Sequence, residues 1–199
     1  MYGLVNKAIE DLVVSLTGEE TWLEIVRRAG IDVVTFVSLD SYPDEYTHRL
    51  VTAASEVLDL PPHEVLERFG EHWVRYTGRE GYGHLLAAYG TDVATFLGNL
   101  DALHSRVIMI MPELRPPSFR IVEDGPGRFL VHYHSTRTGL APMVTGLLRG
   151  IGSLFDVQLS VERRERREDG ADHDVFAVTI TPEDPAPTDT TLDLVPADT

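Results

Sequence analysis

The segment LDALHSRVIMIMPELRPPSF, residues 100–119, contains the point at which the character of the chain changes. Up to this point, apolar side chains recur at intervals of three and four residues, which is the spacing of one helix face. Pro112 ends the helical pattern, because proline lacks an amide hydrogen and clashes with the preceding turn. After Pro116-Pro117, runs rich in branched and aromatic residues predict strands. The segment therefore separates an N-terminal helical part from a C-terminal part built on strands.

The N-terminal part is expected to form a series of helices. The predicted helices cover residues 2–16, residues 21 to about 30, Asp44–Val57, Pro62–Tyr76, His84–Tyr89 and Thr91–Met111. Gly18 ends the first helix, and the Thr21–Glu24 spacing predicts a capping box at the start of the second. The last helix is the longest, and Pro112 stops it.

The C-terminal part is expected to form two pairs of strands with one helix between them. The predicted strands are Ser118–Glu123, Phe129–His134, Val157–Arg166 and Val175–Thr181, and the helix covers Ala141–Phe155. This order predicts an α+β fold with a four-stranded antiparallel sheet and an inserted helix. We expect a single domain over residues 1–181. Residues 182–199 are rich in proline and acidic residues and lack Lys and Arg, so they are expected to be a disordered tail.

Composition narrows the possible functions. The chain has 199 residues and a formal net charge of -15, so nucleic acid and anionic membranes are poor partners. It has no cysteine, which excludes disulfides, thiolate metal sites and iron–sulfur clusters. The first residues lack the features of a signal peptide, and no apolar run is long enough to span a bilayer, so a cytoplasmic location is expected.

His104 is unusual among the histidines because its neighbours at helical spacing are apolar. The stripe consists of Val93, Leu97, Leu100, His104, Val107, Ile108 and Met111. One interpretation is a buried neutral histidine whose ring N–H bonds a carbonyl group. The other is an axial ligand to a porphyrin iron, since a porphyrin needs only one imidazole from the protein. A zinc site would need several protein ligands, and no HExxH or similar cluster supplies them.

A second candidate feature is the pattern Tyr133-x-Ser135-x-Arg137. On a strand these three side chains share one face, where two hydroxyls and a guanidinium could bind a pair of carboxylates. The alternative is an exposed strand with ordinary polar residues. His132 and His134 lie on the opposite face of the same strand, so neither is expected to reach the iron.

Taken together, these features resemble the haem nitric oxide/oxygen-binding (H-NOX) family, which includes the haem domain of soluble guanylate cyclase and stand-alone bacterial sensors. The resemblance covers Met1 to about Ile180. It rests on MYGLVNKAI at 1–9, LDALHSRV at 100–107, LRPPSF at 114–119 and YHSTRTGLAPMV at 133–144.

The resemblance implies a haem b cofactor between the helical part and the sheet. His104 would be the proximal iron ligand, and Tyr133, Ser135 and Arg137 would hold the propionates. Pro117 corresponds to the family proline that presses on the porphyrin; on its own it would only stiffen the loop.

The resemblance also bears on the gas ligand and the partner. Oxygen-binding members carry a tyrosine at the position of Met143, and a thioether donates no hydrogen bond. The other expected distal residues are Leu4, Val5, Trp73 and Leu147. Nitric oxide and carbon monoxide are therefore expected ligands and oxygen is not, although the Trp73 indole N–H could donate. The signal would pass to a separate enzyme such as a histidine kinase or a nucleotide cyclase.

Two other classes of function stay open from the sequence. A haem-dependent oxidase or peroxidase would need a distal acid or base, which Met143 and Trp73 supply poorly. A plain interaction module without haem would make His104 a core residue and Tyr133, Ser135 and Arg137 a surface patch.

Overall fold

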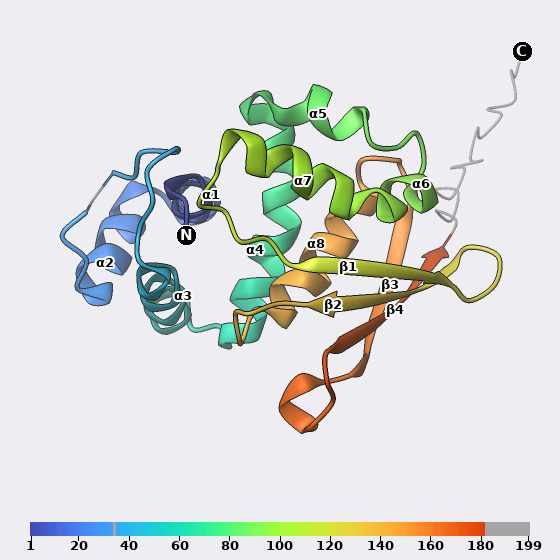
Figure 1. The fold of residues 1–199 in the computed structure, drawn as a ribbon. Helices are drawn as coiled ribbons and strands as arrows, with labels where there is room; N and C mark the ends of the chain where they lie inside the picture. The colour runs from blue at the N-terminus through green and yellow to red at the C-terminus, as the bar shows by residue number, and fades with distance from the viewer. Residues whose placement is uncertain (34, 182–199) are drawn as a thin grey trace, which may run out of the picture.

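The computed structural model describes residues 1–33 and 35–181 of the chain, and the predicted tail at 182–199 lies outside the described residues. The helical part contains α1 (Gly3–Thr17), α2 (Glu19–Ala29), α3 (Asp44–Leu58), α4 (Pro62–Thr77), the π-helical η1 (Gly78–Tyr82), α5 (Gly83–Ala87), α6 (Val93–Gly98) and α7 (Leu100–Ile110). The second part contains β1 (Ser118–Glu123), β2 (Arg128–His134), α8 (Ala141–Gly152), β3 (Gln158–Glu165), the 3-10 turn η2 (Arg167–Asp169) and β4 (Asp174–Thr181). Figure 1 shows α4 and α8 between the first three helices and the sheet.

The sheet has the order β1-β2-β4-β3, and all neighbouring strands are antiparallel. Along β2, Phe129, Val131 and Tyr133 are buried, because alternate side chains of a strand point to the same face. His132 and His134 point to the other face, as expected. The predicted α+β fold, with a helix inserted between the second and third strands, is confirmed. None of the described helices combines the length and the apolar character needed to cross a membrane.

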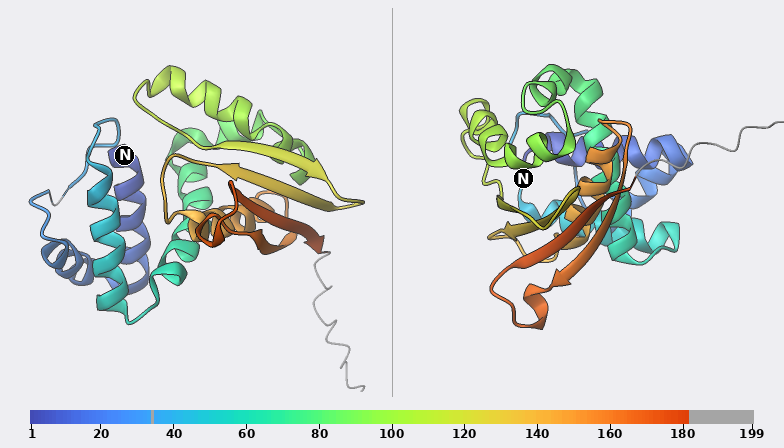
Figure 2. Two further views of the ribbon diagram at one scale, coloured as in Figure 1. Left: turned by 60° about the horizontal axis from the view of Figure 1, so that its bottom comes forward. Right: turned by 90° about the vertical axis from the view of Figure 1, so that its right-hand side faces the viewer.

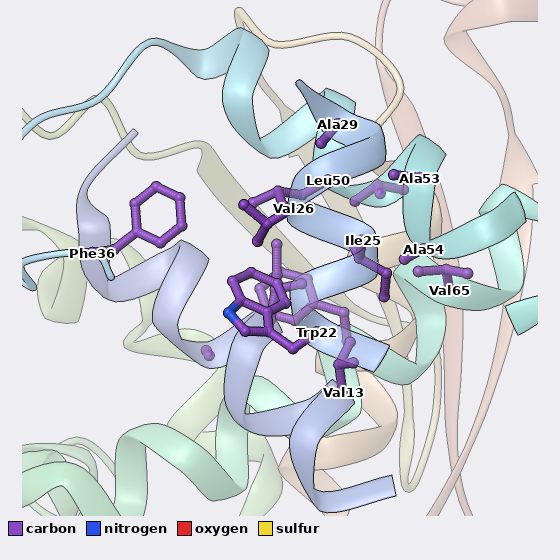
Figure 3. Close-up of a cluster of buried hydrophobic side chains, with 14 of the residues drawn as sticks. Val13, Trp22, Ile25, Val26, Ala29, Phe36, Leu50, Ala53, Ala54 and Val65 are labelled. Atoms are coloured by element: carbon purple, nitrogen blue, oxygen red, sulfur yellow. The ribbon is translucent and has the colours of Figure 1, made fainter. Parts of the chain in front are cut away.

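The core consists of two hydrophobic clusters. The first joins α1–α4 around the fully buried Trp22, Ile25 and Leu50 (Figure 3). The second joins α6, α7 and α8 to the inner face of the sheet, around Leu148, Val131 and Phe176. The views in Figure 2 show α1–α3 set to one side of the sheet. The space between the two clusters is where the candidate site lies.

Helices α4 and α8 are in close contact because glycines face the opposite backbone. A Cβ atom built on Gly146 would lie 1.9 Å from the Glu67 carbonyl oxygen. One built on Gly70 would lie 2.1 Å from the Met143 carbonyl oxygen. Neither position leaves room for a side chain, so the two helices pack backbone to backbone.

The predicted long helix Thr91–Met111 is wrong in one respect, because Asn99 divides it into α6 and α7. Asn99 has φ -102° and ψ 6°, and its side-chain amide donates to the Tyr89 carbonyl at 2.9 Å. Gly98 and Asn99 are both weak helix formers, and asparagine readily exchanges helical bonds for such local ones. Asp92 caps α6 by accepting from the Thr95 N–H.

The predicted capping box at Thr21 is also wrong, since α2 begins two residues earlier, at Glu19. Gly18 adopts φ 90°, which lets the chain turn directly from α1 into α2. Glu19 and Glu20 then occupy the first turn, where negative charge favours a helix start. The Thr21 hydroxyl instead donates to the Thr17 carbonyl at 3.2 Å. The other predicted boundaries differ from the observed ones by at most three residues, and several coincide.

Candidate functional site

A cavity of about 260 Å³ lies between the two hydrophobic clusters. It is bounded by α1, α4, α7, α8, the start of β1 and the end of β2. All ten residues singled out from the sequence line it: Leu4, Val5, Trp73, His104, Pro117, Tyr133, Ser135, Arg137, Met143 and Leu147. Most of its remaining lining is apolar.

His104 reaches the cavity from α7 and is half-buried. Its ring packs against Phe119, with centroids 5.8 Å apart and planes inclined by 29°. Burial lowers the pKa of His104, opposed by the negative charge of Asp101 and by the Pro117 carbonyl group. The imidazole is therefore neutral at physiological pH.

The Nδ1 atom of His104 is buried and has no hydrogen-bond partner among the described residues. Buried polar atoms without a hydrogen-bond partner are rare in folded proteins, and they often have a functional role. A neutral imidazole with an unpartnered nitrogen at an apolar cavity is suited to an axial ligand. The predicted apolar stripe is wrong at Ile108, whose side chain is 37% exposed and points away from the core.

Asp101 fixes α7 to the sheet at the level of His104. Its carboxylate accepts the Phe119 N–H at 2.7 Å and the Ser118 hydroxyl at 3.0 Å. Figure 1 shows α7 above β1. The histidine, the strand start and the preceding prolines therefore form one connected unit.

The polar edge of the cavity comes from Tyr133, Ser135 and Arg137, but they do not share a strand face as expected. Strand β2 ends at His134, and the following segment turns toward the N-terminal helices. Ser135 and Arg137 still line the cavity. Burial raises the pKa of Tyr133, so the phenol stays protonated and able to donate.

Arg137 also joins the two parts of the molecule. Its Nε donates to Asp44 Oδ2 of α3 at 2.7 Å, and its Nη1 donates to the Arg115 carbonyl at 2.6 Å. Partial burial acts to raise the pKa of Asp44, but hydrogen bonds from Arg137 and the N-terminal amine outweigh it and lower that pKa to about 2. The cavity edge thus carries a cation positioned by an ionised carboxylate.

The Asp44 contact predicts a pH-dependent contribution to stability. A carboxyl whose pKa falls from 3.8 to about 2 on folding stabilises the fold above about pH 4, and this contribution is lost as the pH falls toward 2. Asp44→Asn should cost at most about 1 kcal/mol at pH 6, since the carboxylate side chain is 41% exposed. Denaturant titrations of the parent and Asp44→Asn at equal cofactor content measure their free energies of unfolding between pH 6 and 3. The difference between the two free energies should shrink as the pH falls. A difference that does not change with pH would contradict this assignment.

The cavity wall also includes Leu4 and Val5 of α1, Trp73 of α4, and Met143 and Leu147 of α8. Met143 and Trp73 pack against the N-terminal cluster. Tyr82, at the end of η1, lines the same cavity and was not anticipated from the sequence. Its hydroxyl is a second potential donor besides the Trp73 indole.

Sequence reasoning also missed Phe119, Asp101 and Asp44. Phe119 was part of the quoted LRPPSF segment, and its ring lies between those of His104 and Tyr133. Asp101 stands one turn before His104, which could have suggested a supporting role. Asp44 had no local signal, because its partner Arg137 is 93 residues away.

These residues fit a haem group. The walls are apolar, one neutral imidazole has an unpartnered nitrogen, and the polar edge offers two hydroxyls and a guanidinium suited to carboxylates.

The family model described as Haem-NO-binding matches residues 2–163. Among curated proteins, soluble guanylate cyclase gcy-35 of Caenorhabditis elegans is 31% identical over 188 residues, covering 90% of this chain and 27% of the relative. Guanylate cyclase soluble subunit beta-2 of Rattus norvegicus is 34% identical over 124 residues, covering 57% of this chain and 18% of the relative. The chain thus spans about a quarter or less of these relatives.

Solved structures share the fold. An H-NOX protein from S. oneidensis in the Fe(II)NO state matches with a TM-score of 0.82 at 21% identity, covering 91% of this chain and 99% of that one. An unliganded Fe(II) H-NOX protein from K. algicida matches with a TM-score of 0.79 at 21% identity, covering 91% and 97% of the two chains.

Proposed function

Since the chain belongs to the haem-NO-binding (H-NOX) family of haem-based gas-sensor domains, we propose that it binds nitric oxide and carbon monoxide at a haem b iron held by His104. The observation that carries the proposal is the buried Nδ1 of His104, which has no hydrogen-bond partner among the described residues and belongs to a ring lining an apolar cavity. Family membership also makes the chain a sensor and not a catalyst, as expected from the sequence.

The polar edge would hold the propionates. Tyr133 and Ser135 would donate their hydroxyls, and Arg137 would supply the charge. Asp44 would keep the Arg137 side chain in position, because it binds Nε at 2.7 Å. Leu4, Val5, Trp73, Met143 and Leu147 would enclose the opposite side and exclude water.

Selectivity for nitric oxide and carbon monoxide follows from the residue at position 143. When bound, ferrous haem supplies an open coordination site, and bound dioxygen gains from a hydrogen-bond donor that methionine cannot provide. Trp73 and Tyr82 line the cavity and carry hydrogen-bond donors. The proposal requires that neither of them stabilises an oxygen complex.

Absorption spectra of the ferrous protein test the proposal directly. In air, the parent should form no stable oxygen complex, whereas nitric oxide and carbon monoxide should each shift the Soret band. Met143→Tyr should slow oxygen dissociation by roughly tenfold, since a hydrogen bond to a charged group is worth about 1.5–3 kcal/mol. Met143→Phe, which has the same ring without the hydroxyl, is the matched control.

A stable oxygen complex in the parent would overturn the selectivity. Trp73→Phe and Tyr82→Phe would then identify the donor. A purified protein without a Soret band would overturn the haem assignment itself.

Signal transmission would run through the contacts of His104. The Asp101 carboxylate ties α7 to the start of β1, directly after Pro117. A change in tension on the His104 ring would therefore pass through α7 and Pro117 to the sheet, and the N-terminal helices would shift relative to the sheet. A separate signalling enzyme, such as a histidine kinase or nucleotide cyclase, would bind the altered surface. We propose a cytoplasmic location for this exchange, because the relatives are named as soluble cyclases.

A further inference from the structure

Three histidines and one aspartate gather on the face of the sheet opposite the cavity. His132 and His134 come from β2, and Asp172 and His173 come from the segment just before β4. Nδ1 of His132 and Nε2 of His173 share a hydrogen bond of 2.8 Å. The rings of His134 and His173 stack, with centroids 4.0 Å apart and planes inclined by 21°.

The sheet register brings these residues together. Phe129, Val131 and Tyr133 face the core, so the alternation of β2 turns His132 and His134 outward. Strand β4 pairs with β2 such that His132 lies opposite Val175 and Tyr133 lies opposite Asp174. His173 immediately precedes this pairing and therefore lies beside the end of β2.

The arrangement of donor atoms suits a metal ion. One ligand atom each from His134, Asp172 and His173 lies within 4.8 Å of the others. His173 Nδ1 and Asp172 Oδ2 are 3.2 Å apart. Two ligand atoms of a tetrahedral zinc ion, bound at about 2.0–2.2 Å, are about 3.4 Å apart, so this pair needs little rearrangement.

The chemistry of the ligands favours a divalent transition metal. Imidazole and carboxylate together suit zinc, whereas an all-oxygen set would be expected for calcium or magnesium. The Asp172 side chain is 91% exposed, which leaves the site open to ions from solution.

We propose that His134, Asp172 and His173 form a binding site for a divalent transition metal ion of the zinc class. His132 is a positioning residue, because its hydrogen bond holds the far nitrogen of the His173 ring, as outer partners do for metal-bound histidines. Solvent completes the coordination. The site is independent of the haem proposal, since none of its three ligands lines the cavity.

The ion would fasten the turn before β4 to the end of β2. Arg167 already joins these two segments, as its Nη1 donates to the Ser135 carbonyl at 2.9 Å. His134 directly precedes Ser135, which lines the cavity. Metal binding would therefore restrain the segment that carries the polar edge.

Equilibrium dialysis tests the site. The full, haem-loaded chain is dialysed against zinc chloride at pH 7.5, and bound zinc is measured by mass spectrometry. The parent should bind one zinc ion that the His134→Ala/His173→Ala double variant does not bind. Each single variant should weaken binding by roughly tenfold or more, since loss of even an outer partner costs that much. His48→Ala, at an exposed histidine on α3, is the matched control and should bind as the parent does.

His132 is tested separately by two substitutions. His132→Leu should weaken zinc binding, and His132→Gln, which can still hydrogen-bond to His173, should restore part of the affinity. Unfolding temperatures and Soret spectra without zinc should match the parent for every variant compared. Equal zinc binding by the parent and the double variant, or loss of the same ion in His48→Ala, would overturn the proposal.

Discussion

His104→Ala is expected to abolish normal haem ligation. The substitution removes the imidazole, whose Nδ1 has no hydrogen-bond partner among the described residues. It leaves an apolar gap between Phe119 and the Pro117 carbonyl group. Because loss of an outer partner alone weakens metal binding by roughly 10–100-fold, loss of the iron ligand should weaken haem retention at least that much. Haem content per chain and the position of the Soret band measure the effect.

Two additional measurements separate a lost ligand from a damaged fold. Added imidazole should restore a ligated spectrum to His104→Ala, because a small ring can enter the space left by the side chain. His84→Ala removes an exposed histidine on α5, close to the cavity wall, and should leave both haem content and spectrum unchanged. Normal ligation in His104→Ala would assign the axial role to another residue and end the sensor proposal in its present form.

Gly146→Ala is expected to cause a large loss of stability. The new Cβ atom would lie 1.9 Å from the Glu67 carbonyl oxygen and 2.8 Å from its carbonyl carbon, both backbone atoms that cannot rotate away. Helices α4 and α8 must separate to accept it. Overpacking of this kind costs about 3 kcal/mol, which corresponds to a fall in Tm of roughly 6–12 °C for a chain of this size.

The separation should also disturb the cavity, because Trp73 of α4 and Met143 and Leu147 of α8 form its wall. Thermal unfolding followed by circular dichroism, at matched haem content, measures the stability. Gly98→Ala is the control, since a Cβ there meets nothing within 4 Å and alanine favours the helix by about 1 kcal/mol. Similar Tm values for Gly146→Ala and the parent would mean that the helices do not pack backbone to backbone in solution.

The sequence determined the order of the elements because their signals are local. The periodicity before Pro112 and the strand pattern after Pro117 depend only on near neighbours, so the α+β fold followed from them. The absence of cysteine and the apolar surroundings of His104 limited the candidate chemistry in the same way. Local signals failed to predict the structure where a tertiary contact competed with them. At Asn99, the side-chain amide donates to the Tyr89 carbonyl group, and the expected helix is divided there.

Tertiary structure alone decided which residues meet. Asp44 and Arg137 are 93 residues apart, yet they share a 2.7 Å ion pair at the cavity edge. Ser135 and Arg137 line the cavity although their strand ends before them, because the chain turns there toward α3. His132, His134 and His173 meet only through the pairing of β2 with β4. Such contacts depend on helix packing and strand register, which bring distant residues together and leave no trace in the spacing along the chain.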